Sequence, residues 1–162
     1  MTAPAGTTKL DQARVELHRA LVDVMAACGW PAERAHPLPP RQIVSPTGWV
    51  DAPRLQDVST EGARALTATF PVAVALDGAD REQVQQLDKL LAHGWTALEA
   101  VKVPGDRPGA SHTARVLTAG PEFLDVGGIE TRAVVFSVRL TLHVRTLCSG
   151  PATPSDEAST AP

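Results

Sequence analysis

The sequence of 162 residues contains two cysteines, no tyrosine and few aromatic side chains of any kind. Cys28 and Cys148 lie far apart and are too few for a disulfide framework, so each is expected to be a small core or boundary residue. Aromatic residues make up 4% of the sequence, and no platform of stacked rings for single-stranded nucleic acid is evident.

Long apolar runs and a large excess of charge are also missing. No run approaches the roughly 20 apolar residues of a membrane-spanning helix, and residues 1–8 lack the basic and apolar regions of a signal peptide. We therefore expect a soluble protein that stays in the cytoplasm. The formal net charge is −3, and Asp156 and Glu157 account for two of those units. A near-neutral body argues against a dedicated nucleic-acid-binding protein, which needs a strong basic field.

The composition favours one globular domain. Hydrophobic residues make up 43% and charged residues 20% of the chain, values typical of a protein that folds around a core. Both ends contain mainly small residues and proline, the C-terminal end also contains acid, and apart from Met1 neither has a large apolar side chain. We expect a flexible N-terminus over residues 1–7, a single domain over 8–148 and a disordered tail over 149–162.

A first helix is predicted over residues 9–28, because apolar side chains recur there at the spacing of one helical face. These side chains are Leu10, Leu17, Leu21, Val24 and Cys28. Thr8 is the expected N-terminal cap, with Asp11 at the third helical position, and Gly29 is expected to end the helix.

A second helix is predicted over residues 80–93, with Asp80 as its cap and Gln83 at the third helical position. Its buried stripe is Val84, Leu87, Leu90 and Leu91. Gly94 is expected to interrupt the helix, so that residues 95–101 form a second short helix or a turn.

Between the two helices, residues 31–53 contain six prolines, which forbid a long helix. Short extended pieces at residues 42–44 and 49–50 predict a small hairpin, which Trp30 and Trp49 would anchor to the domain.

A strand is predicted over residues 64–76, where large and small side chains alternate as expected for one core face. Because Pro71 has no N–H group, we expect this strand to lie at an edge of the sheet or to be bulged at that residue.

The last third of the chain is predicted to form a hairpin. Residues 112–119 alternate weakly, residues 121–128 are expected to be a connection that ends in a Gly127-Gly128 turn, and residues 131–147 alternate most clearly. The large side chains of this last segment predict the central strand of the sheet: Val134, Phe136, Val138, Leu140, Leu142 and Val144. Fully extended it would span roughly 50 Å, so it either bends or projects beyond the domain.

These elements predict an α+β fold. We expect a largely antiparallel, twisted sheet with amphipathic helices packed on one face and a long C-terminal strand. Residues 104–109 are rich in proline and glycine and are expected to form a loop.

Reactive groups are scattered rather than clustered. The five histidines are not at metal-ligand spacing, and no cysteine or carboxylate completes a ligand set. No serine lies in a G-x-S-x-G motif, and a turn followed by a helix cap accounts for Asp77, Gly78 and Asp80. We therefore expect no catalytic residue, no metal and no cofactor.

Basic residues line the polar side of the last strand. Arg139, His143 and Arg145 share this side, and Arg132 precedes it. One interpretation is a solvated sheet face. The other is that this face, or an overhanging end of the strand, contacts another subunit or another protein, because the planar guanidinium pairs well with carboxylates. Nucleic-acid contact is a weaker third alternative.

The order of these segments resembles tail terminator proteins of long-tailed (siphovirus-type) bacteriophages, in particular phages of actinobacteria. The resemblance covers about residues 8–147. It is carried by the amphipathic helix, the proline-rich stretch, and three later segments, which are RALTATFPVAVALDG at 64–78, DREQVQQLDKLL at 80–91 and RAVVFSVRLTLHVR at 132–145. A Val126-Gly127-Gly128 turn precedes the last of these.

The resemblance implies a non-enzymatic virion protein. Such proteins form a hexameric ring on the head-proximal end of the tail tube, stop its polymerisation and present a surface to the head-tail connector. The implied partners are further copies of the chain, the major tail tube protein and the connector or stopper protein, and genomic DNA would pass through the ring without specific binding. The implied location is the tail of the virion, after assembly in the host cytoplasm.

The resemblance brings no catalytic residues. On the reasoning above, we nominate six residues as contacts with other copies or with the tube: Arg132, Arg139, His143, Arg145, Phe70 and Pro71. The alternatives are another neck or tail-completion protein, a small α+β module that binds a small molecule or peptide, and an enzyme that uses the scattered histidines and acids.

Overall fold

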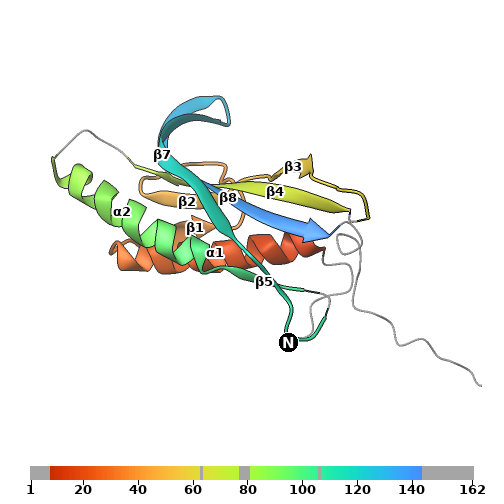
Figure 1. Ribbon diagram of the computed structural model, residues 1–162. Coiled ribbons are helices and arrows are strands. Elements are labelled where there is room, and N and C mark those ends of the chain that lie inside the picture. The colour runs from red at the N-terminus through yellow and green to blue at the C-terminus, as the bar shows by residue number, and fades with distance from the viewer. Residues whose placement is uncertain (1–7, 63, 77–80, 106, 144–162) are drawn as a thin grey trace, which may run out of the picture.

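The computed structural model describes residues 8–62, 64–76, 81–105 and 107–143 (Figure 1). The two ends predicted to be flexible, 1–7 and 149–162, lie outside these residues. The described elements follow in chain order: α1 (Lys9–Ala27), a 3-10 turn (Ala32–Arg34), β1 (Ala35–His36), β2 (Thr47–Val50), β3 (Arg54–Asp57), β4 (Ala65–Ala75), α2 (Arg81–Glu99), β5 (Lys102–Pro104), β6 (Ser111–Thr113), β7 (Arg115–Val126) and β8 (Ile129–His143).

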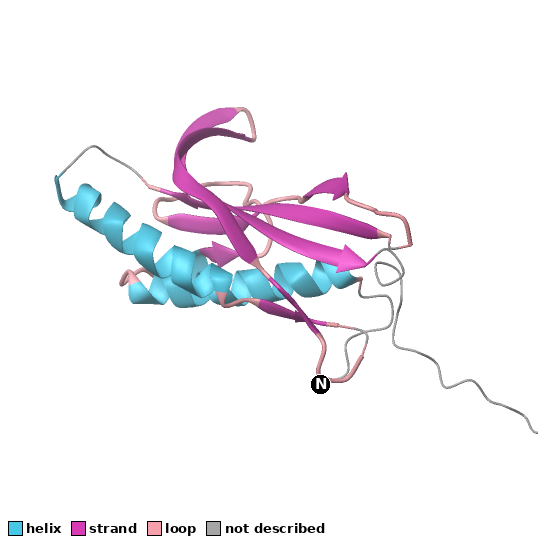
Figure 2. Ribbon diagram, in the orientation of Figure 1, coloured by secondary structure: helices cyan, strands magenta, loops and turns pink. Residues whose placement is uncertain are grey.

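Six of the strands form one sheet in the order β1-β2-β4-β8-β7, and β3 pairs with β4 on the same side as β2. All neighbouring strands are antiparallel except β1 and β2. Strands β5 and β6 form a separate hairpin around the predicted loop over residues 104–109. Both helices lie on one face of the large sheet (Figure 2). The predicted α+β fold, with a mostly antiparallel sheet and a long C-terminal strand, is confirmed.

Helix α1 forms as predicted, and its first turn is fixed by side chains. The Thr8 hydroxyl accepts a hydrogen bond from the Asp11 N–H, at 3.1 Å, and the Asp11 carboxylate accepts one from the Thr8 N–H, at 2.9 Å. This reciprocal capping box satisfies two backbone donors that the first helical turn leaves without partners. The helix face that packs on the sheet buries mainly apolar side chains: Ala13, Leu17, Leu21, Val24 and Met25.

Helix α2 differs from the prediction, because it continues through Gly94 to Glu99 without a break. A Cβ atom on Gly94 would lie 2.8 Å from Cε1 of the Phe136 ring. The glycine therefore lets the helix backbone approach the ring of β8 rather than ending the helix. The predicted cap Asp80 lies outside the described residues.

The hairpin predicted in the proline-rich segment is also wrong. Residues 42–44 belong to no strand, and β2 pairs with β4 on one side and with β1 on the other. Residues 47–50 are fully covered, so this short strand is an interior part of the main sheet. The backbone N–H and C=O groups of β2 are therefore paired with β1 and β4 rather than with the other strand of a local hairpin.

Strand β4 is an interior strand, contrary to the edge position predicted from Pro71. Strand β8 pairs along its whole length on one side, while on the other side β2 pairs with residues 72–75 and β3 with residues 66–69. Pro71 lies in the gap between β2 and β3, where its carbonyl accepts a hydrogen bond from the Asp51 N–H at 2.8 Å. In a strand the N–H and C=O of one residue point to the same side. The missing N–H of Pro71 thus faces the gap and interrupts no ladder.

Strand β4 also buries both of its faces near its C-terminal end, where one core face was predicted. Phe70, Val72 and Val74 pack under the helices, and Ala73 and Ala75 belong to a second cluster on the opposite face. This second cluster surrounds the fully buried Trp49 of β2, with Ala133 and Val135 of β8. Leu124 and Val126 of β7 cover it.

Strands β7 and β8 form one long hairpin joined by Gly127 and Gly128, whose φ angles are 63° and 84°. The predicted glycine turn is confirmed, and positive φ at both turn positions is the geometry of a tight hairpin. The expected connection over residues 121–126 is instead strand, in register with residues 129–134. Strand β8 is central, as predicted, because it lies between β4 and β7. Residues 144–147 of the predicted strand lie outside the described part.

The hairpin extends beyond the rest of the sheet. Strand β4 pairs only with residues 133–143 of β8, so residues 129–132 are paired with β7 alone. Figure 1 shows this end of the hairpin rising from the sheet and curling over the face opposite the helices. The predicted projection of the long strand is therefore observed at its N-terminal end.

Candidate functional site

Two surfaces of the described chain carry the candidate functional residues. One is the sheet face opposite α1 and α2, which we call the helix-free face. The other is the curled end of the β7–β8 hairpin, residues 121–132, which we call the hairpin tip.

The structure divides the predicted contact residues between these surfaces. Arg139 is half-buried and His143 exposed, and both lie on the helix-free face of β8. Arg132 is exposed in the hairpin tip opposite Phe123, on the other side of the strand. Arg145 lies outside the described residues. Arg132 therefore does not join Arg139 and His143 in one patch, because alternate residues of a strand point to opposite faces.

The structure also separates Phe70 and Pro71, which were predicted to lie together at a contact edge. Phe70 is fully buried, and the Arg14 guanidinium lies 5.7 Å from the centre of its ring. The structure thus moves Phe70 from the expected contact edge into the core, where a cation–π contact covers it. Pro71 is half-buried on the helix-free face, beside Ser137 of β8.

A row of three arginines crosses the helix-free face. Arg54 of β3 pairs with Thr69 of β4, Thr69 pairs with Arg139 of β8, and Arg139 pairs with Arg115 of β7. Directly paired residues of antiparallel strands present their side chains on the same face. We call Arg54, Arg139 and Arg115 the arginine row. The sequence pattern indicated only Arg139, since Arg54 and Arg115 join the row through strand pairing.

The arginine row is not paired with acidic side chains in the part of the chain that the structure describes. None of its three guanidinium groups forms an ion pair with a carboxylate of the described residues. The structure does show an ion pair elsewhere, between Arg19 and Glu16 on α1. Its neighbours in the same face are mainly hydroxyl and amide side chains: Gln56, Thr67, Thr69, Ser137 and Thr141. Arg54 and Arg115 are exposed and Arg139 is half-buried. The row is thus an uncompensated positive stripe.

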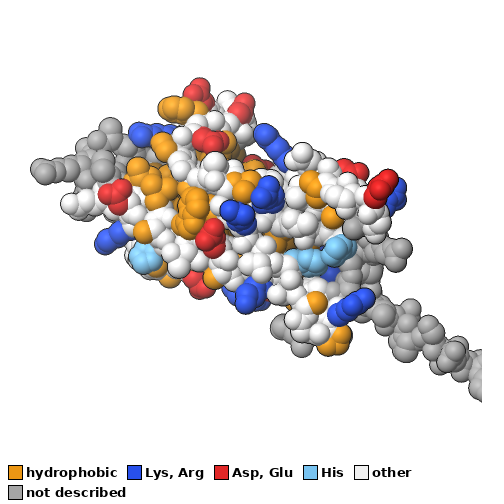
Figure 3. All heavy atoms as spheres, in the orientation of Figure 1, with side chains coloured by type: hydrophobic (Ala, Val, Ile, Leu, Met, Phe, Trp, Pro, Cys, Tyr) orange, Lys and Arg blue, Asp and Glu red, His pale blue; other side chains and the backbone are white. Residues whose placement is uncertain are grey.

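The hairpin tip combines exposed apolar and acidic side chains. Phe123 is 70% exposed and Ile129 is 69% exposed, the two highest values among the large apolar residues of the described chain. Asp125 and Glu130 lie directly opposite each other, and the Asp125 carboxylate also accepts a hydrogen bond from the Gly128 N–H at 2.8 Å. The space-filling view shows acidic side chains beside hydrophobic atoms at this end of the molecule (Figure 3).

Reactive chemistry finds little support among the described residues. They contain no group of three or more histidine, cysteine, aspartate or glutamate side chains placed to hold a metal ion. The rings of His112 and His143 are neighbours, with centroids 6.1 Å apart and planes inclined by 57°. Partial burial raises the pKa of the Cys28 thiol, which disfavours the nucleophilic thiolate.

Neither described helix has the length and apolar character needed to cross a bilayer.

The described residues therefore define an α+β protein whose strongest candidate site is a charged and apolar surface. No protein-family model matches the sequence, and no curated protein matches it. Among solved structures, the fold is similar to that of a chain in the virion of a native gene transfer agent particle. The TM-score is 0.55 at 14% sequence identity, and the match covers 80% of this chain and 93% of that chain. The two chains share a fold.

Proposed function

We propose that this chain is a structural virion protein that forms a ring at the head-proximal end of a phage tail tube. In this role it ends tube polymerisation and joins the tail to the head connector. The observation that carries the proposal is the fold shared with a chain of the gene transfer agent virion, over 93% of that chain. The resemblance of the sequence to tail terminator proteins supports the finer assignment.

The two candidate surfaces fit a protein that acts by binding copies of itself. A projecting tip and a flat sheet face are different surfaces, so contact between them is head-to-tail. Head-to-tail contacts between identical chains close into a ring when the rotation from one copy to the next is suitable. We assign to this contact the residues predicted from the sequence that the structure leaves at the surface, which are Arg132, Arg139, His143 and Pro71, together with Arg145.

The proposal also includes partners and location. The ring, a hexamer in this proposal, binds the major tail tube protein on one side and the connector or stopper protein on the other. Genomic DNA passes through it without specific binding. The chain belongs to the virion tail, is assembled in the host cytoplasm, and acts without catalysis or cofactor.

A second candidate function is another neck or tail-completion protein. It is favoured by the same structural likeness, because the matched chain belongs to a whole virion particle and its description gives no position within that particle. Both candidates require self-assembly, and they differ in whether the ring controls the length of the tube.

The test is electron microscopy of the purified full-length chain, alone and mixed with tail tubes assembled without it. We expect rings, and we expect them at one end of each tube, where further addition of tube protein stops. Rings that bind the connector but leave the tubes growing would favour the second candidate. A chain that stays monomeric at every concentration and never binds tubes would overturn both.

A further inference from the structure

We propose that the outer side of the hairpin tip of one copy binds the arginine row of a second copy. The outer side consists of Phe123, Asp125, Glu130 and Arg132, and the arginine row is Arg54, Arg139 and Arg115. This inference rests on the proposed function, because it names the contact through which copies would form the ring.

The first observation is an unfavourable pair of like charges in the arginine row. Arg115 and Arg139 lie directly opposite each other on neighbouring strands. Like charges in that position destabilise a sheet. No described carboxylate pairs with either guanidinium, and the one acidic residue paired into this face, Glu122, lies opposite Ala133, six residues along β8 from Arg139. Among the described residues, this positive pair therefore has no carboxylate partner.

The second observation is a pair of the opposite sign in the hairpin tip. Asp125 and Glu130 are also directly opposite each other and both are exposed. Arg132 lies two residues from Glu130 on the same side of the strand, whereas Glu122 pairs into the helix-free face. Two acids and one arginine give the outer side a net charge of −1. The tip and the row are thus complementary in charge.

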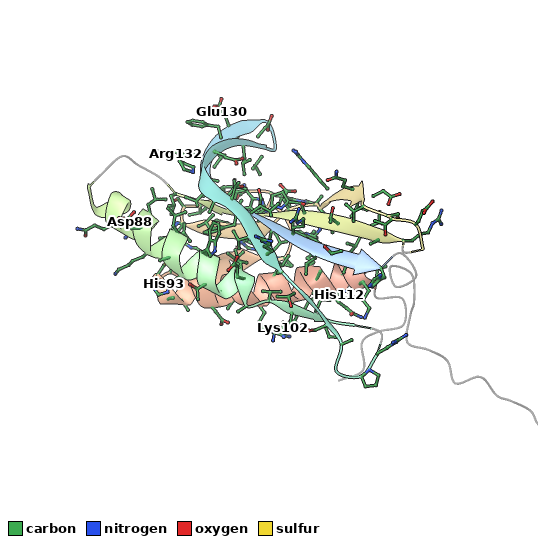
Figure 4. The ribbon with its side chains drawn as sticks, viewed as in Figure 1. Asp88, His93, Lys102, His112, Glu130 and Arg132 are labelled. Atoms are coloured by element: carbon green, nitrogen blue, oxygen red, sulfur yellow. The ribbon has the colours of Figure 1, made fainter. Side chains whose placement is uncertain are left out.

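The curl of the hairpin keeps its own arginine row away from this outer side. Leu124 and Val126 lie on the inner side of the curl and pack in the cluster around Trp49. Since side chains alternate along a strand, Phe123 and Asp125 point the opposite way. Figure 4 shows Glu130 and Arg132 on the outer side of the curl, away from the sheet below. A second copy can therefore reach these groups, whereas the helix-free face of the same chain does not contact them.

Phe123 gives this contact an apolar centre. Phe123 is 70% exposed, with Arg132 directly opposite it and the carboxylates of Asp125 and Glu130 at the next position along the same side. Arginine side chains stack on aromatic rings and pair with carboxylates through the same planar group. An aromatic ring flanked by acids therefore matches a row of arginines better than it matches water or a lysine-rich surface.

The test uses two charge reversals and their combination. Glu130→Arg changes the tip, and Arg139→Glu changes the row, while Asp125 is kept because it also supports the turn. Self-association is measured by sedimentation velocity over a range of concentrations at low salt. We expect each single variant to associate about tenfold more weakly or worse, because each brings like charges together across the contact.

The decisive measurement is an equimolar mixture of the two single variants. In a head-to-tail assembly that alternates them, the basic tip meets the acidic row and the unchanged tip meets the unchanged row. We expect the mixture, and a chain with both reversals, to regain most of the wild-type association. Glu99→Arg and Arg41→Glu, which reverse exposed charges outside both surfaces, are matched controls and should associate like the wild type.

Each other outcome has a distinct meaning. Single variants that form wild-type rings on tubes would overturn the inference and leave the proposed function intact, as would weak single variants whose mixture stays weak. Reversals that lower the melting temperature of the dilute monomer would show the tip binding its own chain, which also overturns the inference. Without such a contact, each reversal replaces a like-charge pair by an opposite-charge pair and does not lower that temperature. A wild-type chain that never associates would overturn the proposed function itself.

Discussion

At the scale of single residues, Gly94 and Phe136 show how two distant segments determine each other. Gly94 lies in the middle of α2, and the ring of Phe136 in β8 occupies the space that a Cβ atom would need. Alanine normally favours a helix over glycine by about 1 kcal/mol. Close packing against the ring opposes that preference here.

We expect Gly94→Ala to destabilise the protein by about 1–3 kcal/mol, because overpacking forces the ring or the helix to move. Chemical denaturation of the purified variant measures the change. A second variant that adds Phe136→Leu removes the ring atoms nearest to the new methyl group, and the two changes should compensate in part. Higher stability of Gly94→Ala alone would mean that the helix and sheet are not in contact at this point.

The alternation along β8 gives a second expectation at the same scale. Val138 is fully buried in the main core, paired with Phe70 of β4 and Val116 of β7, whereas its neighbour Arg139 is half-buried on the helix-free face. Val138→Asp should cost more than about 4 kcal/mol and prevent folding, since it buries a charge without a partner. Arg139→Glu should not lower the melting temperature of the protomer, because it replaces the like-charge pair with Arg115 by an opposite-charge pair. Soluble expression and circular dichroism melting distinguish the two, and equal behaviour would contradict the register of β8.

At the scale of elements, α1 illustrates how a short sequence signal fixes a helix end. The Thr8 hydroxyl and N–H both donate to the Asp11 carboxylate, and these hydrogen bonds hold the pKa of Asp11 below its ordinary value. A lowered pKa in the folded state means that the unfolded state binds the proton more readily. The stabilisation is therefore complete above the unfolded carboxyl's pKa and is lost as the pH falls through the lower, folded value.

Thr8→Ala should lower the free energy of unfolding by about 1 kcal/mol at neutral pH, because it removes the cap. The difference from the wild type should shrink below about pH 4, where the carboxylate of the unfolded chain is protonated. Denaturant titrations across acidic pH measure this dependence. Asp23→Asn, which removes an exposed carboxylate from the same helix, is the control. A constant difference between wild type and Thr8→Ala at all pH values would exclude the carboxylate from the cap.

At the scale of the whole molecule, the residues that form the main core lie apart from those proposed to contact other copies. The helices cover one face and supply most of the core, while the arginine row and the hairpin tip lie away from it. Residues 129–132 pair in the ladder only with β7, so the end of the tip adds little to the pairing of the main sheet, and its main packing contribution is Val126 on the cluster around Trp49. The fold should therefore tolerate a shorter hairpin.

Deletion of Asp125, Val126, Ile129 and Glu130 tests this separation. It joins Leu124 and Thr131, which are paired in the structure, directly to the Gly127-Gly128 turn. Removing two residue pairs preserves the alternation of hydrogen-bonded and non-hydrogen-bonded pairs that the turn requires. We expect a cooperatively folding protomer whose self-association is weakened about tenfold or more, because the acidic pair is gone. Wild-type association of the shortened chain, measured by sedimentation, would place the contact elsewhere.

Much of the architecture was predictable from local patterns. The capped first helix, the stripe of α2, the Gly127-Gly128 turn and the long alternating strand are each encoded within a short stretch, where side-chain spacing matches a helix or a strand. Those elements were sufficient to predict the α+β class. The errors at Gly94, at Pro71 and in the hairpin predicted at residues 42–50 occurred where the outcome depends on a partner far away in the chain. Residues 121–126, in contrast, pair with the adjacent residues 129–134.

The sequence alone thus determined the elements, because helical and strand periodicity are properties of neighbouring residues. Only the tertiary structure decided which residues share a surface. Arg54, Arg115 and Arg139 come from three separate strands and form one row because strand pairing sets their register. Phe70 became a core residue and Phe123 an exposed one for the same reason: burial depends on what packs against a side chain, and no single stretch of sequence specifies that.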